Sequence, residues 1–284
     1  MTLYPEYVIL YIHNNKPWSI MQKIVLFDMD GTLTPPREHL DYSLVETLIN
    51  LSRFAEIGIV SGSDYDYIIQ QCGFLTTKDE ISQNLHILPC NGTMHYAPPK
   101  YRSQKHKMVH NKDMKQQLGS HDLSTIFKKL INYQDHIVSH YDIPLTGHFV
   151  SYRGSMINWC PIGRNADSSD REKFSVFDKS FGISSFRRTL LEQVREEFSN
   201  ARIPVTIKLG GETSFDIFPN GWDKTYAMNH FEDYEIYFLG DRCGDNGNDK
   251  EIFDALQPEC SFWVDGTQHT KEILQDILIP KLRK

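Results

Sequence analysis

The feature that most constrains the fold is a set of short, largely apolar runs that are each followed by a polar residue. The runs are Ile24–Phe27, Ile57–Val60 and Glu235–Leu239, and the polar residues after them are Asp28, Ser61 and Asp241. Runs of this length are typical of strands that are buried on both faces of a parallel sheet. Ligands of such sheets bind at the carboxyl ends of the strands. The sequence therefore predicts that these polar side chains lie together at one edge of a sheet.

Segments of helical character alternate with these runs. Leu44, Leu48 and Leu51 recur at spacings of four and three residues, which is the pattern of a half-buried helix. The other expected elements are a helix at Tyr65–Cys72, a strand at Leu85–Leu88, a helix at Asp249–Leu256, a strand at Ser261–Val264 and an amphipathic helix at His269–Leu278. This alternation predicts the α/β fold class with a doubly wound parallel-sheet core.

The middle of the chain breaks the alternation and is expected to form an inserted α+β cap domain. Ser184–Phe198 carries one apolar helical face, with Ser184 or Ser185 as its N-cap. Short strands are expected at His148–Tyr152, Met156–Trp159, Val205–Lys208 and Ser214–Phe218, whereas residues 95–150 are polar and weakly periodic. We therefore expect a core domain of residues 21–94 and 221–284, a cap of residues 95–220, and an N-terminal extension of residues 1–20.

The composition is that of an ordinary globular protein, and it narrows the classes of partner. Apolar residues make up 40% of the chain and charged residues 24%. The net charge of −7 disfavours a large contact with nucleic-acid phosphates. The apolar runs fall far short of the roughly 20 residues that span a bilayer, and the five cysteines form no CxxC pair. We expect a cytoplasmic protein with neither nucleic acid nor membrane as partner.

Four aspartates are expected to meet at the carboxyl edge of the sheet: Asp28, Asp30, Asp241 and Asp249. Neighbouring carboxylates repel and raise each other's pKa, and a bound hard cation such as Mg²⁺ relieves that repulsion. The sequence therefore predicts a Mg²⁺ site, although Asp249 is equally consistent with a helix cap. An EF-hand loop that starts at Asp28 is disfavoured, because its sixth and twelfth positions hold Leu33 and His39.

The sequence around these aspartates resembles the four motifs of the haloacid dehalogenase-like phosphotransferases. The matching segments are Asp28–Thr34 for motif I, Ser61 for motif II, Lys224 in Gly221–Lys224 for motif III, and Gly240–Asp249 for motif IV. The resemblance implies that Asp28 attacks phosphorus to give an aspartyl-phosphate and that Asp30 moves the proton of the sugar oxygen. It also implies that Ser61 and Lys224 bind the phosphoryl group in transfer.

A second set of segments narrows the resemblance to the eukaryotic-type phosphomannomutases, over most of residues 21–266. These segments are Thr34–Arg37, residues 152–158, residues 161–165 and residues 210–224. The family implies that Arg153, Arg164, Arg171 and Ser214 hold the distal phosphate of a hexose bisphosphate, as the planar fork of arginine suits phosphate oxygens. It also implies that Asp216 hydrogen-bonds sugar hydroxyls and that Arg37 contacts the substrate. Asp216 pairing with a cap arginine is the alternative.

The expected activity is interconversion of mannose 6-phosphate and mannose 1-phosphate for the supply of GDP-mannose. Hexose 1,6-bisphosphate would serve as activator, and the family implies a homodimer through the cap. One departure favours an alternative, a sugar-phosphate phosphatase of the same fold: Ser61 stands where the family usually has Gly, and Ser63 could share its role. A non-enzymatic module with a structural acidic pocket is the third hypothesis. The family has an acidic residue that serves a second cation, shortly after the helix of motif IV. That residue aligns near Ala255, beside Asp254, so no second metal is assigned.

Overall fold

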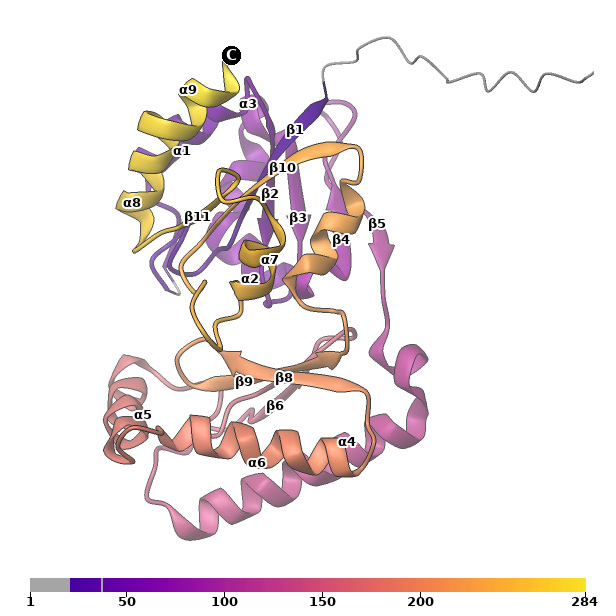
Figure 1. The fold of residues 1–284 in the computed structure, drawn as a ribbon, viewed down its shortest axis with the longest axis vertical. Helices are drawn as coiled ribbons and strands as arrows, with labels where there is room; N and C mark the ends of the chain where they lie inside the picture. Colours follow the sequence, from indigo (N-terminus) through magenta and orange to yellow (C-terminus); the bar gives the residue numbers. More distant parts are fainter. Residues whose placement is uncertain (1–20, 37) are drawn as a thin grey trace, which may run out of the picture.

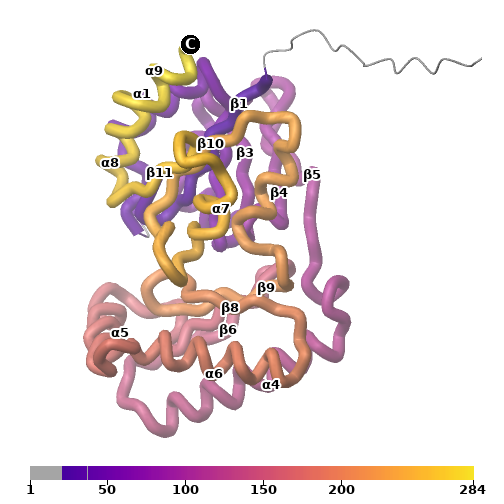
Figure 2. The backbone as a smooth tube through the Cα atoms, viewed as in Figure 1, coloured from indigo at the N-terminus to yellow at the C-terminus, as the bar shows by residue number. Residues whose placement is uncertain are grey.

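The computed structural model describes residues 21–36 and 38–284, which form two sheets that follow one another along the long axis of the molecule (Figure 1). The seven-stranded core sheet has the order β11-β10-β1-β2-β3-β4-β5, and the four-stranded cap sheet has the order β6-β7-β9-β8. The chain passes from the core sheet to the cap sheet after β5 and returns after β9 (Figure 2). The predicted N-terminal extension, residues 1–20, lies outside the described residues.

The core sheet has a parallel centre and an antiparallel edge. Its parallel strands are β1 (Gln22–Phe27), β2 (Glu56–Val60), β3 (Leu85–Leu88), β10 (Tyr234–Gly240) and β11 (Ser261–Trp263). β4 (Met94–Ala97) and β5 (Lys107–Asn111) extend the sheet in antiparallel pairing. Successive residues of β1 face opposite sides, so that Val25 and Phe27 join one apolar cluster whereas Ile24 and Leu26 join another. The predicted α/β class with a doubly wound core is thereby confirmed.

Short helices cover both faces of the core sheet. They are α1 (Tyr42–Leu51), α2 (Tyr65–Cys72), α3 (Asp79–Ser82), α7 (Lys250–Ala255), α8 (Thr267–Glu272) and α9 (Ile279–Leu282). Short 3-10 helices lie at η1 (Gly73–Thr77), η2 (Cys90–Gly92) and η3 (Lys224–His230), and a short π-helix lies at η4 (Ile273–Leu278). In the part of the chain that the structure describes, no helix combines the length and apolarity needed to cross a membrane.

The cap sheet is antiparallel and has one apolar and one polar face. Its strands are β6 (Val150–Tyr152), β7 (Ile157–Trp159), β8 (Val205–Gly210) and β9 (Ser214–Pro219). Trp159 and Phe215 belong to one apolar cluster with residues of α4 (Met114–His140) and α6 (Phe186–Asn200). Both helices lie on the side of the cap sheet away from the core (Figure 1). The neighbouring positions on the same strands, such as Asn158, line a cleft between cap and core. A further helix, α5 (Ser168–Ser180), lies at one end of the cap.

The structure differs from the sequence expectation in the segment after residue 95. β4 and β5 pair with the core sheet, so we propose that the insertion begins after Asn111 rather than at residue 95. The long helix α4 was not expected either. Its buried stripe of Leu123, Ile126, Leu130 and Ile137 is interrupted by Gln134, which is itself buried. Gln134 is satisfied by hydrogen bonds with Pro161 O and with the indole of Trp159, both at 2.9 Å.

Candidate active site

Three aspartates meet at the carboxyl edge of the core sheet. Asp28 follows β1, Asp241 follows β10, and Asp249 immediately precedes α7. Parallel pairing of β1 with β10 aligns their ends, and the Asp28 N–H donates to Leu239 O at 2.9 Å. As a result, carboxylate oxygens of the three aspartates all lie within 4.8 Å of one another. The strand order thus brings three negative charges together at the carboxyl edge of the sheet, where the sequence predicted a cluster of aspartates.

Glycine at position 31 makes this approach possible. Gly31 has a φ of 91°, a left-handed conformation that favours glycine, and a Cβ at this position would clash with the Asp241 carboxylate. The loop after β1 can therefore lie directly against the loop after β10. The motif I glycine is needed both for the turn and for the space beside Asp241.

A buried lysine lies between two of the carboxylates. Lys224 is 1% exposed and its Nζ donates to Oδ1 of Asp28 and to Oδ1 of Asp249. Asp223 caps η3, where Lys224 is the first residue, by accepting from the Thr225 N–H at 2.9 Å. Burial and the Asp249 carboxylate raise the pKa of Asp28 well above its ordinary value, against the opposing effect of Lys224. Burial would lower the pKa of Lys224, but Asp249 and Asp28 raise it.

The acidic cluster has the donor set of a hard divalent cation. Asp241 Oδ1 and Asn248 Oδ1 are buried oxygens that have no hydrogen-bond partner among the described residues. Burial, followed by the charge of Asp249, raises the pKa of Asp241 to about 6. Unsatisfied buried oxygens and mutually repelling carboxylates are both relieved by a bound cation. Asp28, Asp241, Asp249 and Asn248 therefore fit a metal site, and Asn248 is a candidate ligand that sequence reasoning missed.

Asp30 stands apart from this trio. Its Oδ1 accepts from Gln71 Nε2 at 3.3 Å and from the Tyr67 hydroxyl at 3.5 Å, and it lines the cleft beside Asp28. The three carboxylates that lie within 4.8 Å of one another do not include that of Asp30, so its role as a metal ligand stays a prediction. Its place in the cleft is compatible with proton transfer at the leaving oxygen.

The loop after β2 forms another part of the same cleft. Ser61 is buried, and its Oγ accepts from the Ser63 N–H at 3.1 Å. Ser61, Gly62 and Ser63 all line the cleft together with Asp28. We call the lining residues Asp28, Asp30, Ser61, Asp241 and Asn248, with Lys224 and Asp249 behind them, the core wall.

The opposite side of the cleft belongs to the cap, and it contains the residues that the family resemblance picked out. We call Arg153, Arg164, Arg171, Ser214 and Asp216 the cap wall. Arg153 extends from the turn between β6 and β7, and one of its terminal nitrogens donates to Gly62 O of the core at 2.6 Å. The predicted arginine cluster therefore faces the aspartates across the cleft. Arg37 lies outside the described residues.

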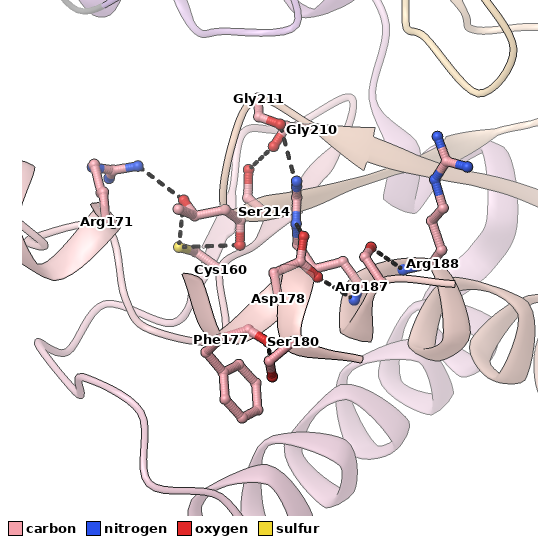
Figure 3. A network of polar contacts seen from close by, with 12 residues as sticks. Cys160, Arg171, Phe177, Asp178, Ser180, Arg187, Arg188, Gly210, Gly211 and Ser214 are labelled. Atoms are coloured by element: carbon pink, nitrogen blue, oxygen red, sulfur yellow. Dashed lines mark hydrogen bonds and ion pairs between the residues drawn. The ribbon is translucent and has the colours of Figure 1, made fainter. Parts of the chain in front are cut away.

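Hydrogen bonds to backbone oxygens and small polar groups orient the other members of the cap wall. Arg171, on α5, donates to Ala166 O at 3.1 Å and to Thr213 Oγ1 at 2.9 Å, and Figure 3 shows the second of these bonds. Ser214 Oγ donates to Gly210 O at 2.7 Å. A Cβ at Gly210 would lie 2.6 Å from Asp216 Oδ2, so glycine leaves room for that carboxylate.

The turn that precedes Ser214 is held from both sides. Gly211 O accepts from Arg187 at 3.2 Å and from Arg242 at 2.8 Å (Figure 3 shows Arg187). Arg187 belongs to the cap helix α6 and is paired with Asp178, whereas Arg242 belongs to the core loop after Asp241. A further link between the domains is the ion pair of Lys208, on β8, with Glu251, on α7. Neither Arg242 nor Lys208 was expected from the sequence, because each acts through a contact between distant segments.

Comparison with known proteins shows which family the sequence matches. The profile of the family described as eukaryotic phosphomannomutase matches residues 44–280. A phosphomannomutase of Arabidopsis thaliana is 36% identical over 237 residues, which cover 82% of this chain and 87% of the relative. One from Spinacia oleracea is 36% identical over 260 residues, covering 91% and 96%, and phosphomannomutase 2 of Dictyostelium discoideum is 35% identical over 262 residues, covering 91% and 97%.

Solved structures support the fold. The IMP-nucleotidase of Plasmodium falciparum, as an IMP-bound mutant, aligns with a TM-score of 0.61 at 14% identity, over 90% of this chain and 68% of that one. A trehalose-6-phosphate phosphatase related protein aligns with a TM-score of 0.50 at 15% identity, over 92% of this chain and 100% of that one. At these identities the likeness concerns the fold alone. On the family profile and the relatives of about 35% identity, the chain belongs to the eukaryotic phosphomannomutase family.

Proposed function

We propose that this protein is a phosphomannomutase that interconverts mannose 6-phosphate and mannose 1-phosphate and so supplies mannose 1-phosphate for GDP-mannose. Its family membership supports the activity. The single observation that carries the assignment to residues is the cleft itself, in which the aspartates of the core wall face Arg153, Arg164 and Arg171. A bisphosphorylated hexose needs two anion sites, and the two walls offer one each.

The core wall performs the phosphoryl transfer. An oxygen of Asp28 forms the bond to phosphorus while the bond from phosphorus to the sugar oxygen breaks, and Asp30 gives that oxygen a proton. In the return step Asp30 accepts the proton of a sugar hydroxyl, whose oxygen attacks phosphorus and releases Asp28. Asp28, Asp241, Asp249 and Asn248 would hold Mg²⁺, which would offset the negative charge of the reacting phosphoryl group. Lys224 and Ser61 bind the same phosphoryl group.

The cap wall makes the difference between transfer to sugar and transfer to water. Guanidinium groups of Arg153, Arg164 and Arg171 bind the distal phosphate, and Asp216 accepts from sugar hydroxyls. Arg153 and Arg242 also hold the cap against the core through Gly62 O and Gly211 O. Water is thereby excluded while the hexose 1,6-bisphosphate turns over to present its other phosphate.

The assay that tests this proposal uses mannose 1-phosphate, Mg²⁺ and a catalytic amount of hexose 1,6-bisphosphate. Isomerisation to mannose 6-phosphate with little free phosphate is the expected result. Stoichiometric release of phosphate would contradict it and favour the alternative phosphatase, for which the hydroxyl of Ser61 is the supporting observation. Asp28→Asn should abolish activity in either case. Retention of full activity by this variant would reduce the acidic cluster to a structural feature.

Two further expectations belong to the same proposal. A homodimer through the cap is implied by the family, and sedimentation of the purified chain tests it, because a monomer at micromolar concentration would contradict it. A cytoplasmic location is the second expectation, and fractionation of cells that express the full chain tests it.

A further inference from the structure

A single asparagine connects three members of the cap wall. Asn158 lies in β7, is 2% exposed, and is paired in register with Asp216 on β9. Its Nδ2 donates to Asp216 Oδ1 at 2.7 Å and to Ser214 Oγ at 2.9 Å, with a longer approach of 3.4 Å to Phe215 O. Its Oδ1 accepts from a terminal nitrogen of Arg164 at 2.9 Å.

The chemistry of the partners fixes which way this amide points. A guanidinium can only donate and a carboxylate can only accept, so the oxygen must face Arg164 and the nitrogen must face Asp216. A neutral side chain with a donor at one end and an acceptor at the other is what this position requires. Aspartate here would oppose Asp216 with a like charge, and an apolar residue would leave buried polar groups without partners.

The amide also lies between two opposite charges that line one cleft. Asp216 accepts from its nitrogen and Arg164 donates to its oxygen. Asp216 Oδ2 lies close to Gly62 and Gly210. A Cβ at Gly62 would lie 3.3 Å from this oxygen, and a Cβ at Gly210 would lie 2.6 Å from it. These glycines lie on the side on which cap and core approach each other. The amide therefore directs the carboxylate toward the cleft and sets the angle of the guanidinium.

We infer that Asn158 is a positioning residue for the sugar-phosphate substrate. It contacts no reacting atom; it sets the orientation of Arg164, Ser214 and Asp216, so that one cation for the distal phosphate and one acceptor for sugar hydroxyls face the cleft together. This inference rests on the proposed function and deepens it, since it assigns substrate orientation to a residue outside the set predicted from the sequence.

The matched control is Gln134, the buried amide on the opposite face of the same sheet. It also makes hydrogen bonds at both ends of its amide, but to Pro161 O and Trp159, away from the cleft. Gln134→Ala and Asn158→Ala both delete a buried amide from the cap. Asn158→Asp keeps the shape and the acceptor toward Arg164 but loses the donor toward Asp216.

The experiment compares steady-state kinetics with mannose 1-phosphate and turnover of acetyl phosphate, a phosphoryl donor that has no sugar. We expect Asn158→Ala and Asn158→Asp to raise the KM for mannose 1-phosphate at least tenfold while acetyl phosphate turnover changes less than twofold. Gln134→Ala should lower Tm but leave that KM within twofold. If Asn158→Ala does not fold, the near-isosteric Asn158→Asp still decides the question.

Two results would overturn the inference. One is a KM in both Asn158 variants that matches the KM of Gln134→Ala. The other is an equal loss of acetyl phosphate turnover, which would mean that the substitutions disturb the core wall rather than the orientation of the sugar phosphate. Failure of the proposed function looks different. In that case the wild-type protein itself would not isomerise mannose 1-phosphate, before any variant is compared.

Discussion

The core wall takes its polar groups from the ends of parallel strands, whereas the cap wall takes them from the middle of antiparallel strands and from nearby loops and helices. In the core, Asp28 and Asp241 are brought together by the pairing of β1 with β10, and buried charges hold one another in place. In the cap, Arg164 donates to the amide of Asn158, and Arg171 donates to the hydroxyl of Thr213 and to the backbone oxygen of Ala166. Buried charges are thus in contact with one another in the core wall, and hydrogen bonds run from charged groups to neutral groups in the cap wall.

The largest expected loss of stability comes from removing the positively charged side chain of Lys224 from the core wall. Lys224→Met leaves Asp28 and Asp249 buried without their common partner, so we expect the free energy of unfolding to fall by about 3–5 kcal/mol at pH 7 without Mg²⁺. Mutase activity should also be lost. Chemical denaturation in EDTA and with added Mg²⁺ measures the free energy of unfolding, and Mg²⁺ should restore part of the lost stability. A loss below 1 kcal/mol would mean that the carboxylates do not depend on Lys224.

Removing a cation of the cap wall should have a smaller effect of a different kind. Arg171→Ala deletes a buried guanidinium that faces the core wall, so we expect kcat/KM for mannose 1-phosphate to fall about 100-fold, or about 2.7 kcal/mol. Turnover of acetyl phosphate, which needs the core wall alone, should stay within threefold. Arg188→Ala, at an exposed position of α6, is the control and should change neither quantity. Equal losses with both donors would contradict the division of labour between the walls.

The sequence predicts the core and its aspartates better than it predicts the contacts within the cap. The core strands are apolar on both faces, and the sequence indicated β3 and α2 with the bounds that the structure gives them. The meeting of Asp28 with Asp241 follows from a general property of parallel sheets. In the cap, the pairing of Asn158 with Asp216 depends on the register between β7 and β9, and local sequence does not encode such a register.

Two misses have local physical causes. β5 was not expected because most of its residues are exposed and polar, and its place at the sheet edge comes only from pairing with β4. α4 was missed because Gln134 occupies a buried position that periodicity assigns to an apolar residue. The indole of Trp159, 25 residues away in the chain, is what makes an amide acceptable there.

A third test concerns the support of the core wall. His86 Nδ1 lies 2.8 Å from His95 Nε2, and His86 Nε2 lies 2.6 Å from Glu56 Oε2, so His95 stands at one end of a hydrogen-bonded row of three side chains. The His95 ring also packs at 4.6 Å from that of His230, the last residue of η3, the turn that begins at Lys224. Burial, followed by the charge of His86, lowers the pKa of His95 to about 3.

Because the folded pKa is depressed, the unfolded chain binds the extra proton first, from about pH 6.5 downward. The stabilisation is thus complete above that pH and is lost as the pH falls toward 3. Between pH 7 and pH 5 the free energy of unfolding should fall by about 2 kcal/mol for this one group. Denaturation at the two pH values measures the loss, and His95→Gln should reduce it, whereas His121→Gln, at an exposed position, should not. An unchanged pH dependence in His95→Gln would assign the loss to other groups.

The smallest expected effect is also the one that tests how far the two walls are coupled. The Ser61 hydroxyl oxygen accepts a hydrogen bond from the Ser63 N–H. Between these two residues, Gly62 O accepts a hydrogen bond from Arg153 of the cap. Ser61→Gly frees that N–H to donate to a phosphoryl oxygen and leaves the Arg153 contact in place, so transfer to sugar should gain on transfer to water by about threefold. The ratio of mannose 6-phosphate to free phosphate, measured at one substrate concentration, reports the change. Ser63→Ala keeps the N–H and its bond to Ser61 and should leave the ratio as it is. A shift toward phosphate release in Ser61→Gly would mean instead that the core wall, rather than cap closure, decides which acceptor receives the phosphoryl group.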